Sequence, residues 1–133
     1  MTSNKNECNF TRAIICKRES CANEDAWCPE SNNVPKEQIE FHFNYTNDIY
    51  MLETQGSMLT NETVNQFLLQ YQNESGGLVS KIFKTSSSTS KINKFLFEHP
   101  LRTNYIRITP IEFTIAIVMR FEFYSKGILY AQN

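Results

Sequence analysis

The sequence predicts an all-β domain, an antiparallel β-sandwich or barrel, and three observations lead to this prediction. Short runs of alternating apolar and polar residues recur between residues 38 and 124. Turn signals rich in Asn, Gly, Ser and Pro separate them, at a spacing of about eight to twelve residues that is typical of antiparallel domains. No helical stripe of convincing length accompanies them. With 133 residues, 41% of them hydrophobic, the chain forms one domain that can bury a substantial core.

The predicted strands follow from this alternation and from the turns between them. The turn signals are Asn47-Asp48, the hairpin Asn73–Gly77, where glycine adopts positive φ at low cost, and the prolines of His99-Pro100 and Pro110, which end the strands before them. The predicted strands are Gln38–Phe43, Ile49–Glu53, Gln66–Gln72, Leu78–Phe83, Ile92–Phe97, Tyr105–Thr109 and Ile115–Tyr124.

The last predicted strand has the longest alternation in the chain. Its apolar face contains Ile115, Ile117, Met119, Phe121 and Phe123, and its other face contains Ala116, Val118, Arg120, Glu122 and Tyr124. We therefore expect the apolar face to lie in the core, where Phe121→Ala would cost about 3–5 kcal/mol.

Charge and hydropathy exclude two classes of protein. The net charge of −1 and the isoelectric point of about 6.1 do not indicate a nucleic-acid-binding surface. No run approaches the roughly 18 apolar residues of a membrane helix. The first ten residues, MTSNKNECNF, do not form a secretory signal. A secreted protein with this sequence would therefore be a mature chain or a fragment.

Glycosylation sequons and cysteines nevertheless favour the secretory route. Four Asn-x-Ser/Thr sequons begin at Asn9, Asn44, Asn61 and Asn73. The four cysteines, Cys8, Cys16, Cys21 and Cys28, are crowded near the N-terminus at spacings that do not match the usual zinc pairs. Two disulfides are the favoured interpretation, and free thiols or a metal site are the alternatives. Three pairings are compatible with four cysteines.

Several sequence motifs, in register, carry a resemblance to a known family. They are NYIRITPIEFTIAIVMRFEFY at Asn104–Tyr124, Ala26-Trp-Cys-Pro29, Pro35-Lys-Glu37, Thr54-Gln-Gly56 and FLLQYQNESG at Phe67–Gly76. Together they resemble the discoidin, or coagulation factor 5/8 type C, domain, and most of all the discoidin domain of the collagen-binding discoidin domain receptors. The resemblance implies a discoidin-like antiparallel β-sandwich or jelly roll, similar to galactose-binding domains. Residues 1–26 would be a shortened Cys-rich segment, 27–126 the sandwich and 127–133 a tail.

The sequence departs from this family at the positions of its cysteines. Members usually have a Cys just after the last strand, where this chain has Ser125-Lys126. In the collagen receptors the Cys after the Trp pairs with one in the last strand, and Val118 stands at about the matching position. The resemblance therefore implies that Cys28 pairs locally. The Arg that follows the receptors' TQG is replaced by Ser57, so we do not expect collagen binding.

The resemblance also indicates a ligand-binding loop at one end of the sandwich. In the coagulation-factor relatives, apolar residues of the loop after TQG enter membranes. The matching residues here are Ser57, Met58, Leu59 and Thr60. Met58 and Leu59 either form an exposed apolar contact or pack into the local core. A glycan on Asn61 and the absence of a Lys/Arg cluster oppose insertion into lipid.

Other polar and aromatic residues have structural interpretations that outweigh functional ones. We expect Trp27 in the core beside Cys28 rather than as a platform for a sugar, and His42 and His99 at the surface. Arg107 and Arg120 are expected to form structural pairs with Glu112 or Glu122, although ligand binding is the alternative. Glu40 and Glu122 would form a carboxylate pair only by an accident of the fold. No nucleophile–base pair, metal cluster or phosphate loop is recognisable, so no catalytic residue, metal or cofactor is predicted.

The leading functional hypothesis is an extracellular, non-catalytic recognition module that binds protein or glycan ligands in adhesion or receptor function. Peripheral binding to phosphatidylserine membranes through Met58 and Leu59 is one alternative. An intracellular galactose-type lectin or assembly subunit is another, and an enzyme is a distant one. A domain that has lost ligand binding and acts as a scaffold, or a fragment, is the last.

Overall fold

The computed structural model describes residues 26–86 and 91–125, and within these ranges it contains five strands and no helix. The strands are β1 (Ile39–Gln55), β2 (Thr63–Gln72), β3 (Leu78–Lys84), β4 (Asn93–Thr114) and β5 (Arg120–Ser125). All pairings between them are antiparallel, in the order β3-β2-β4-β1-β5. The predicted all-β class is therefore confirmed.

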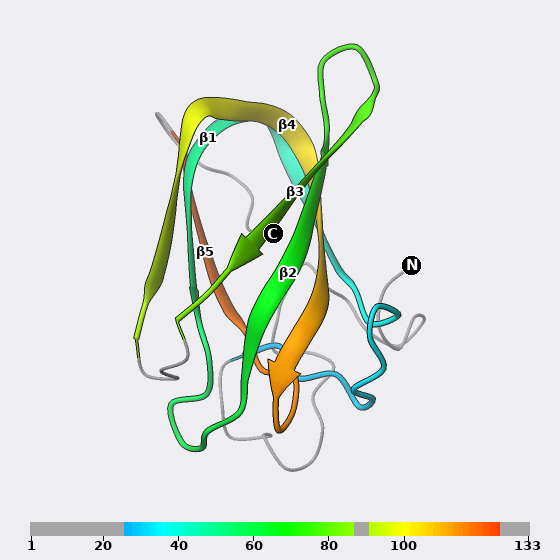
Figure 1. Cartoon of the computed structure of the whole chain (residues 1–133). Coiled ribbons are helices and arrows are strands. Elements are labelled where there is room, and N and C mark those ends of the chain that lie inside the picture. The colour runs from blue at the N-terminus through cyan, green and yellow to red at the C-terminus, as the bar shows by residue number, and fades with distance from the viewer. Residues whose placement is uncertain (1–25, 87–90, 126–133) are drawn as a thin grey trace.

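The two longest strands, β1 and β4, bend and so fold the sheet into two layers. After His42 pairs with Tyr105, the next pair is Asn47 with Thr103, so β1 carries extra residues at its bend. β4 carries extra residues between Leu96, which pairs with Met51, and Leu101, which pairs with Ile49. Such bulges sharpen the bend of a strand. Figure 1 shows β1 and β4 arching over together at one end of the molecule. One layer contains β3, β2, the second half of β4 and the start of β1, and the other contains the first half of β4, the end of β1 and β5.

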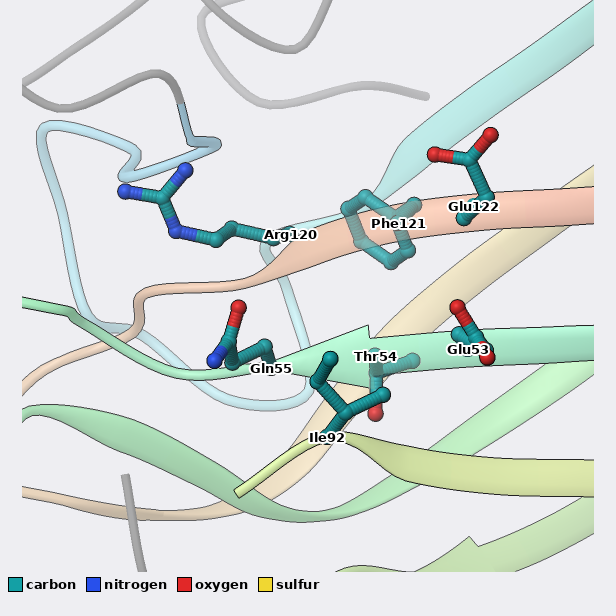
Figure 2. Close-up of a pocket in the computed structure, with 7 residues that line it drawn as sticks. All are labelled: Glu53, Thr54, Gln55, Ile92, Arg120, Phe121 and Glu122. Carbon is teal, nitrogen blue, oxygen red and sulfur yellow. The ribbon is translucent and has the colours of Figure 1, made fainter. Parts of the chain in front are cut away.

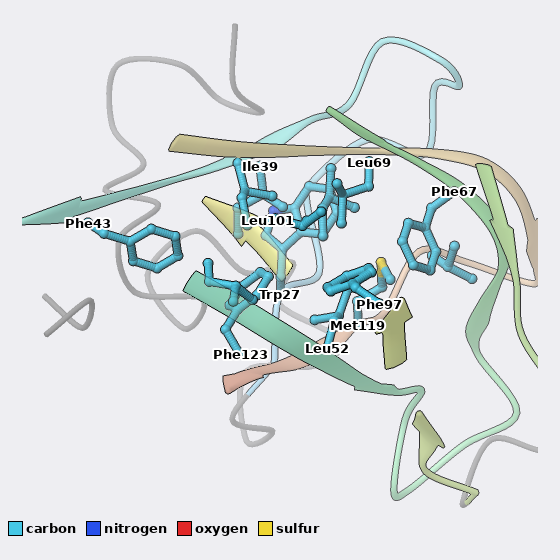
Figure 3. Packing of buried hydrophobic residues seen from close by; sticks show 14 of the residues in the cluster. Trp27, Ile39, Phe43, Leu52, Phe67, Leu69, Phe97, Leu101, Met119 and Phe123 are labelled. Carbon is cyan, nitrogen blue, oxygen red and sulfur yellow. The ribbon is translucent and has the colours of Figure 1, made fainter. Parts of the chain in front are cut away.

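The core lies between these two layers and is largely aliphatic, with aromatic rings that join the layers. Phe67 of β2 and Phe95 of β4 lie 5.6 Å apart between ring centroids, and Phe41 and Phe123 lie 4.9 Å apart. Figure 3 shows buried side chains of this core, among them Phe67 and Phe123, packed between the strands. The buried cluster comprises Trp27, Ile39, Phe43, Ile49, Leu52, Val64, Phe67, Leu69, Phe97, Leu101, Ile106, Ile108, Ile117, Met119 and Phe123.

Three predicted breaks between strands are wrong, because β1 and β4 continue through them. Pro110 pairs with Phe67 next to a shift of register, and Pro100 lies within the bulge of β4. A bulge tolerates a proline because a residue there has no obligatory place in the hydrogen-bonded ladder. The predicted turn at Asn47 is a bulge as well, where the Asn47 side chain donates a hydrogen bond to the Tyr45 carbonyl at 2.8 Å.

The strand predicted from Ile115 begins only at Arg120, so the alternation expected for residues 115–119 is wrong. Ile115 is 65% exposed at a φ of +66°, whereas Val118, expected on the opposite face, is fully buried. The reason is a tight turn, in which the Ala116 amide donates to the Thr114 carbonyl at 2.7 Å. The apolar run here forms a packed turn rather than a pleated strand.

The segment before β1 is fastened to this turn. Trp27 and Met119 exchange two backbone hydrogen bonds, of 2.8 and 3.0 Å, and Trp27 is 2% exposed. Trp27 is therefore a core residue, as predicted. Its neighbour Cys28 forms a small buried cluster with Ala26 and Val118. Cys28 is disulfide-bonded. The other three cysteines, Cys8, Cys16 and Cys21, lie outside the described residues, so the predicted pairing of Cys28 falls outside them as well.

Candidate ligand-binding site

The loop after β1 is a hydrogen-bonded turn that presents two apolar side chains. The Ser57 hydroxyl accepts hydrogen bonds from the amides of Leu59 and Thr60, both at 2.9 Å, and the Ser57 amide donates to the Glu62 carbonyl at 2.9 Å. Ser57 is 1% exposed, so its side chain supports the loop from within rather than facing solvent. Met58 is 55% and Leu59 69% exposed, so the alternative in which they pack into the local core is wrong.

Gly56 gives this loop its close approach to β2. A Cβ atom at residue 56 would lie 2.6 Å from the Thr63 Cβ and 3.0 Å from the Glu62 carbonyl oxygen. Only glycine allows this contact, because these distances are shorter than van der Waals separation. The glycine contact therefore joins the start of the loop to its end at Thr63, and the Ser57 hydroxyl organises the turn between them.

A pocket of about 340 Å³ lies beside this loop, at the same end of the sandwich. It forms where the end of β1, the start of β4 and the start of β5 meet, as Figure 2 shows. The cross-strand pairs Gln55–Arg120 and Glu53–Glu122 build its polar surface. The lining residues are Glu53, Thr54, Gln55, Ile92, Arg120, Phe121 and Glu122.

The charges of this pocket are separated along the strands. The carboxylates of Glu53 and Glu122 lie toward one side in Figure 2, and the Arg120 guanidinium extends toward the other, near Gln55. Like charges on directly opposed residues of a strand pair repel each other. A hydrogen-bonding or cationic group placed between Glu53 and Glu122 would relieve that repulsion. The pocket therefore suits a ligand that donates hydrogen bonds at one end and accepts them at the other.

Neighbouring side chains hold Glu53 in position. The Tyr124 hydroxyl donates a hydrogen bond to it at 2.8 Å, and Lys94 forms an ion pair with it at 3.7 Å. This hydrogen bond, with smaller contributions from burial and from nearby charge, raises the pKa of Tyr124 to about 12. Ile92, 48% exposed, adds an apolar wall of the kind that packs against the face of a sugar ring or an apolar side chain.

The sequence identified only part of this site. The alternation puts Arg120 and Glu122 on the polar face of the last strand, but no local pattern connects Glu53, Gln55 and Ile92 with them. Gln55 is the middle residue of the Thr54-Gln-Gly56 motif, and this motif is the one sequence signal that points to the site. The pairing of the end of β1 with the start of β5 brings these residues together, and it is not visible in a local pattern.

The remaining predicted residues lie elsewhere. His42 and His99 are at the surface, as expected, and His42 lies 3.4 Å from a carboxylate oxygen of Glu40. Arg107 donates two hydrogen bonds to the Gln70 side chain, at 3.0 and 2.8 Å, so the structural pairing holds but its expected partner was wrong. Glu40 does not pair with Glu122, because it accepts a hydrogen bond from Tyr105 at 3.0 Å.

Among the described sequons, Asn44 and Asn61 are exposed and Asn73 is half-buried, and Asn9 lies outside the described residues. Within residues 26–86 and 91–125 there is no group of three His, Cys, Asp or Glu side chains suited to a metal ion. No helix in those ranges is long and apolar enough to cross a membrane.

Solved structures with the same fold include discoidin II and a bacterial carbohydrate-active enzyme module. Native recombinant discoidin II of Dictyostelium discoideum has a TM-score of 0.75 at 16% identity, covering 96% of this chain and 54% of that one. A wild-type discoidin II structure gives the same TM-score and identity, with 53% of its chain covered. CBM32-1 from a family 31 glycoside hydrolase of Clostridium perfringens has a TM-score of 0.65 at 13% identity, covering 93% of this chain and 89% of that one. At these identities the likeness shows the fold.

The fold and the loop-end pocket thus define a discoidin-like β-sandwich. The model of the F5/8 type C domain matches residues 12–123, most of the chain, and the chain belongs to this family. It spans about half the length of the discoidin II chains that it matches. No curated protein sequence matches it.

Proposed function

We propose that this chain is an extracellular, non-catalytic recognition module whose loop-end pocket binds a glycan or a protein ligand. The observation that carries the proposal is the pocket itself. It combines opposed carboxylates, a guanidinium and an amide with the apolar surfaces of Ile92 and Phe121, next to an exposed apolar loop tip. A few convergent polar groups beside apolar surface are the usual composition of a binding site.

The family supports a binding role rather than catalysis. Discoidin and CBM32 domains bind carbohydrates or other ligands and are typically non-catalytic. The sequons and the crowded cysteines favour an extracellular setting in adhesion or receptor function. In support of the closer resemblance to the discoidin domain receptors, Cys28 packs in one buried cluster with Val118, the residue at about the position where that resemblance implies a cysteine. The burial of Ser57 gives no reason to extend the proposal to collagen.

A glycan array followed by calorimetry on the strongest ligand tests the proposal. Gln55→Ala and Glu122→Ala each remove a polar group of the pocket, and each should weaken binding about tenfold, the effect of one hydrogen bond to a charged group. Glu98→Ala is the matched control, because it removes an exposed carboxylate at the opposite end of the sandwich and should leave affinity unchanged. If the pocket variants bind as well as the parent chain, the site is elsewhere.

Binding to phosphatidylserine membranes is a second candidate, favoured by the exposure of Met58 and Leu59. Vesicles of phosphatidylcholine with and without phosphatidylserine distinguish it from binding in the pocket. The Met58→Ala, Leu59→Ala double variant should lose lipid-dependent pelleting if the loop inserts, whereas Glu122→Ala should retain it. Absence of pelleting for the parent chain would exclude this candidate.

A further inference from the structure

A second polar pocket, of about 300 Å³, lies at the end of the sandwich opposite the ligand-binding loop. It forms between the bend of β1, the β2–β3 hairpin and the second half of β4. Its lining residues are Thr46, Gln72, Asn73, Glu74, Arg102, Thr103 and Asn104. Arg102 forms ion pairs with Asp48 at 3.1 Å and with Glu74 at 2.8 Å, so it connects β1 with the hairpin.

One residue of this pocket is the asparagine of a glycosylation sequon. The Asn73 carboxamide oxygen accepts three hydrogen bonds, from the Gly77 amide at 2.8 Å, the Ser75 amide at 3.1 Å and the Ser75 hydroxyl at 2.9 Å. These bonds organise the hairpin through Oδ1. An N-linked sugar is attached through Nδ2, so all three are compatible with glycosylation.

Two glycines shape the hairpin around the Asn73 side chain. Gly77 has no side chain, and a Cβ atom there would lie 3.4 Å from Nδ2. Gly76 adopts a φ of +91°, which reverses the chain without a bulky residue at the tip. Attachment at Nδ2 therefore breaks none of the three hydrogen bonds that the Asn73 carboxamide oxygen accepts within the turn.

We propose that Asn73 carries an N-linked glycan whose first N-acetylglucosamine lies in this pocket and joins the hairpin to β4. The pocket contains the attachment residue, has the hydrogen-bonding side chains that an acetamido sugar needs, and is bordered by the guanidinium of Arg102, which its ion pairs hold in position. The proposal rests on the extracellular setting proposed above. It places the glycan at the end away from the ligand pocket, so that binding there stays unobstructed.

The covalent step is a glycosyl transfer from a lipid pyrophosphate-linked oligosaccharide in the secretory pathway. Nδ2 of Asn73 attacks C1 of the reducing-end N-acetylglucosamine, and a C–N bond forms as the C1–O bond to the pyrophosphate breaks. The lipid pyrophosphate leaves with the electron pair, and the amide proton passes to the transferase base. One hydrogen remains on Nδ2 in the product, available to a neighbouring acceptor.

Glycopeptide mass spectrometry and hydrogen exchange test the proposal on the full chain secreted from a eukaryotic cell line. We expect Asn73 to be occupied. After trimming to one sugar per site, we expect the amides of residues 102–104 to exchange about fivefold more slowly than in protein made without glycosylation, as one net hydrogen bond would cause.

Two controls separate the glycan from the changes that accompany its removal. Ser75→Ala removes the sequon but also a hydrogen bond. Its effect on the exchange of residues 102–104 is therefore measured once in glycosylated and once in unglycosylated protein, and the difference between the two effects is due to the glycan. Asn61→Gln removes a glycan at the opposite end and should leave residues 102–104 unchanged. An empty Asn73 beside an occupied Asn61 would overturn the site, and an occupied Asn73 without slower exchange would overturn the pocket. Neither result depends on ligand binding at the loop end.

Discussion

Replacing Phe123 by alanine tests which part of the last apolar run holds the two layers together. Phe123 is 9% exposed, and its ring lies 4.9 Å from that of Phe41 and 5.7 Å from that of Phe43. Truncating a buried phenylalanine costs about 3–5 kcal/mol through lost transfer energy and the cavity left behind. Because the residue is almost fully enclosed by aromatic neighbours, we expect about 4 kcal/mol for Phe123→Ala.

Two neighbouring substitutions provide the comparison. Phe121 is only partly buried, because it lines the ligand pocket, although its ring lies 5.1 Å from that of Phe41. We therefore expect about 2 kcal/mol for Phe121→Ala, since part of its surface already faces water. Ile115, 65% exposed, should tolerate alanine within about 0.5 kcal/mol. The sequence alone, which placed all three on one buried face, assigned Phe121→Ala about 3–5 kcal/mol.

The assay is urea unfolding of the three variants and the parent chain under oxidising conditions. Equal m-values for all four proteins would indicate that unfolding stays two-state. The test is the order in which the three variants lose free energy of unfolding, with Phe123→Ala losing the most and Ile115→Ala the least. If Phe121→Ala costs as much as Phe123→Ala, or Ile115→Ala costs more than about 2 kcal/mol, the packing described for β5 and its preceding turn is incorrect.

Three further predictions concern the turn, the loop and the half-buried Tyr105. Ile115→Gly should stabilise the chain by about 0.5–1 kcal/mol in urea melts, because glycine relieves the positive φ, and a loss would argue against that backbone conformation. Gly56→Ala should cost about 1–3 kcal/mol in the same assay, because its Cβ would overlap Thr63, and a neutral result would mean that the loop does not approach β2 so closely. Burial, followed by the hydrogen bond to Glu40, raises the pKa of Tyr105 to about 12. Because the folded state favours the neutral phenol, this stabilisation is complete below about pH 10 and is lost as the pH rises toward 12. Ultraviolet titration should show Glu40→Gln lowering that pKa only in part, since burial remains, and an unchanged titration would contradict the contact.

The local alternation predicted where most strands run, because a strand with one buried face must repeat every two residues. It predicted a strand at Gln66–Gln72, which lies within β2, and the hairpin at Asn73–Gly77, both as the structure has them. It could not predict that β1 and β4 continue through their turn and proline signals. Whether such a signal ends a strand or forms a bulge depends on the partner strand, which is distant in sequence.

The candidate site divides in the same way. The loop at Met58 and Leu59 follows from a short motif, and so was predicted together with the family, but the motif does not decide whether these two side chains are exposed or buried. The pocket arises from the register that places Gln55 opposite Arg120 and Glu53 opposite Glu122. By itself, then, the sequence determined the β class, the family resemblance and the loop. Only the tertiary structure decided the pocket and the buried side of the last apolar run, because both depend on how two bent strands pair across long separations in the chain.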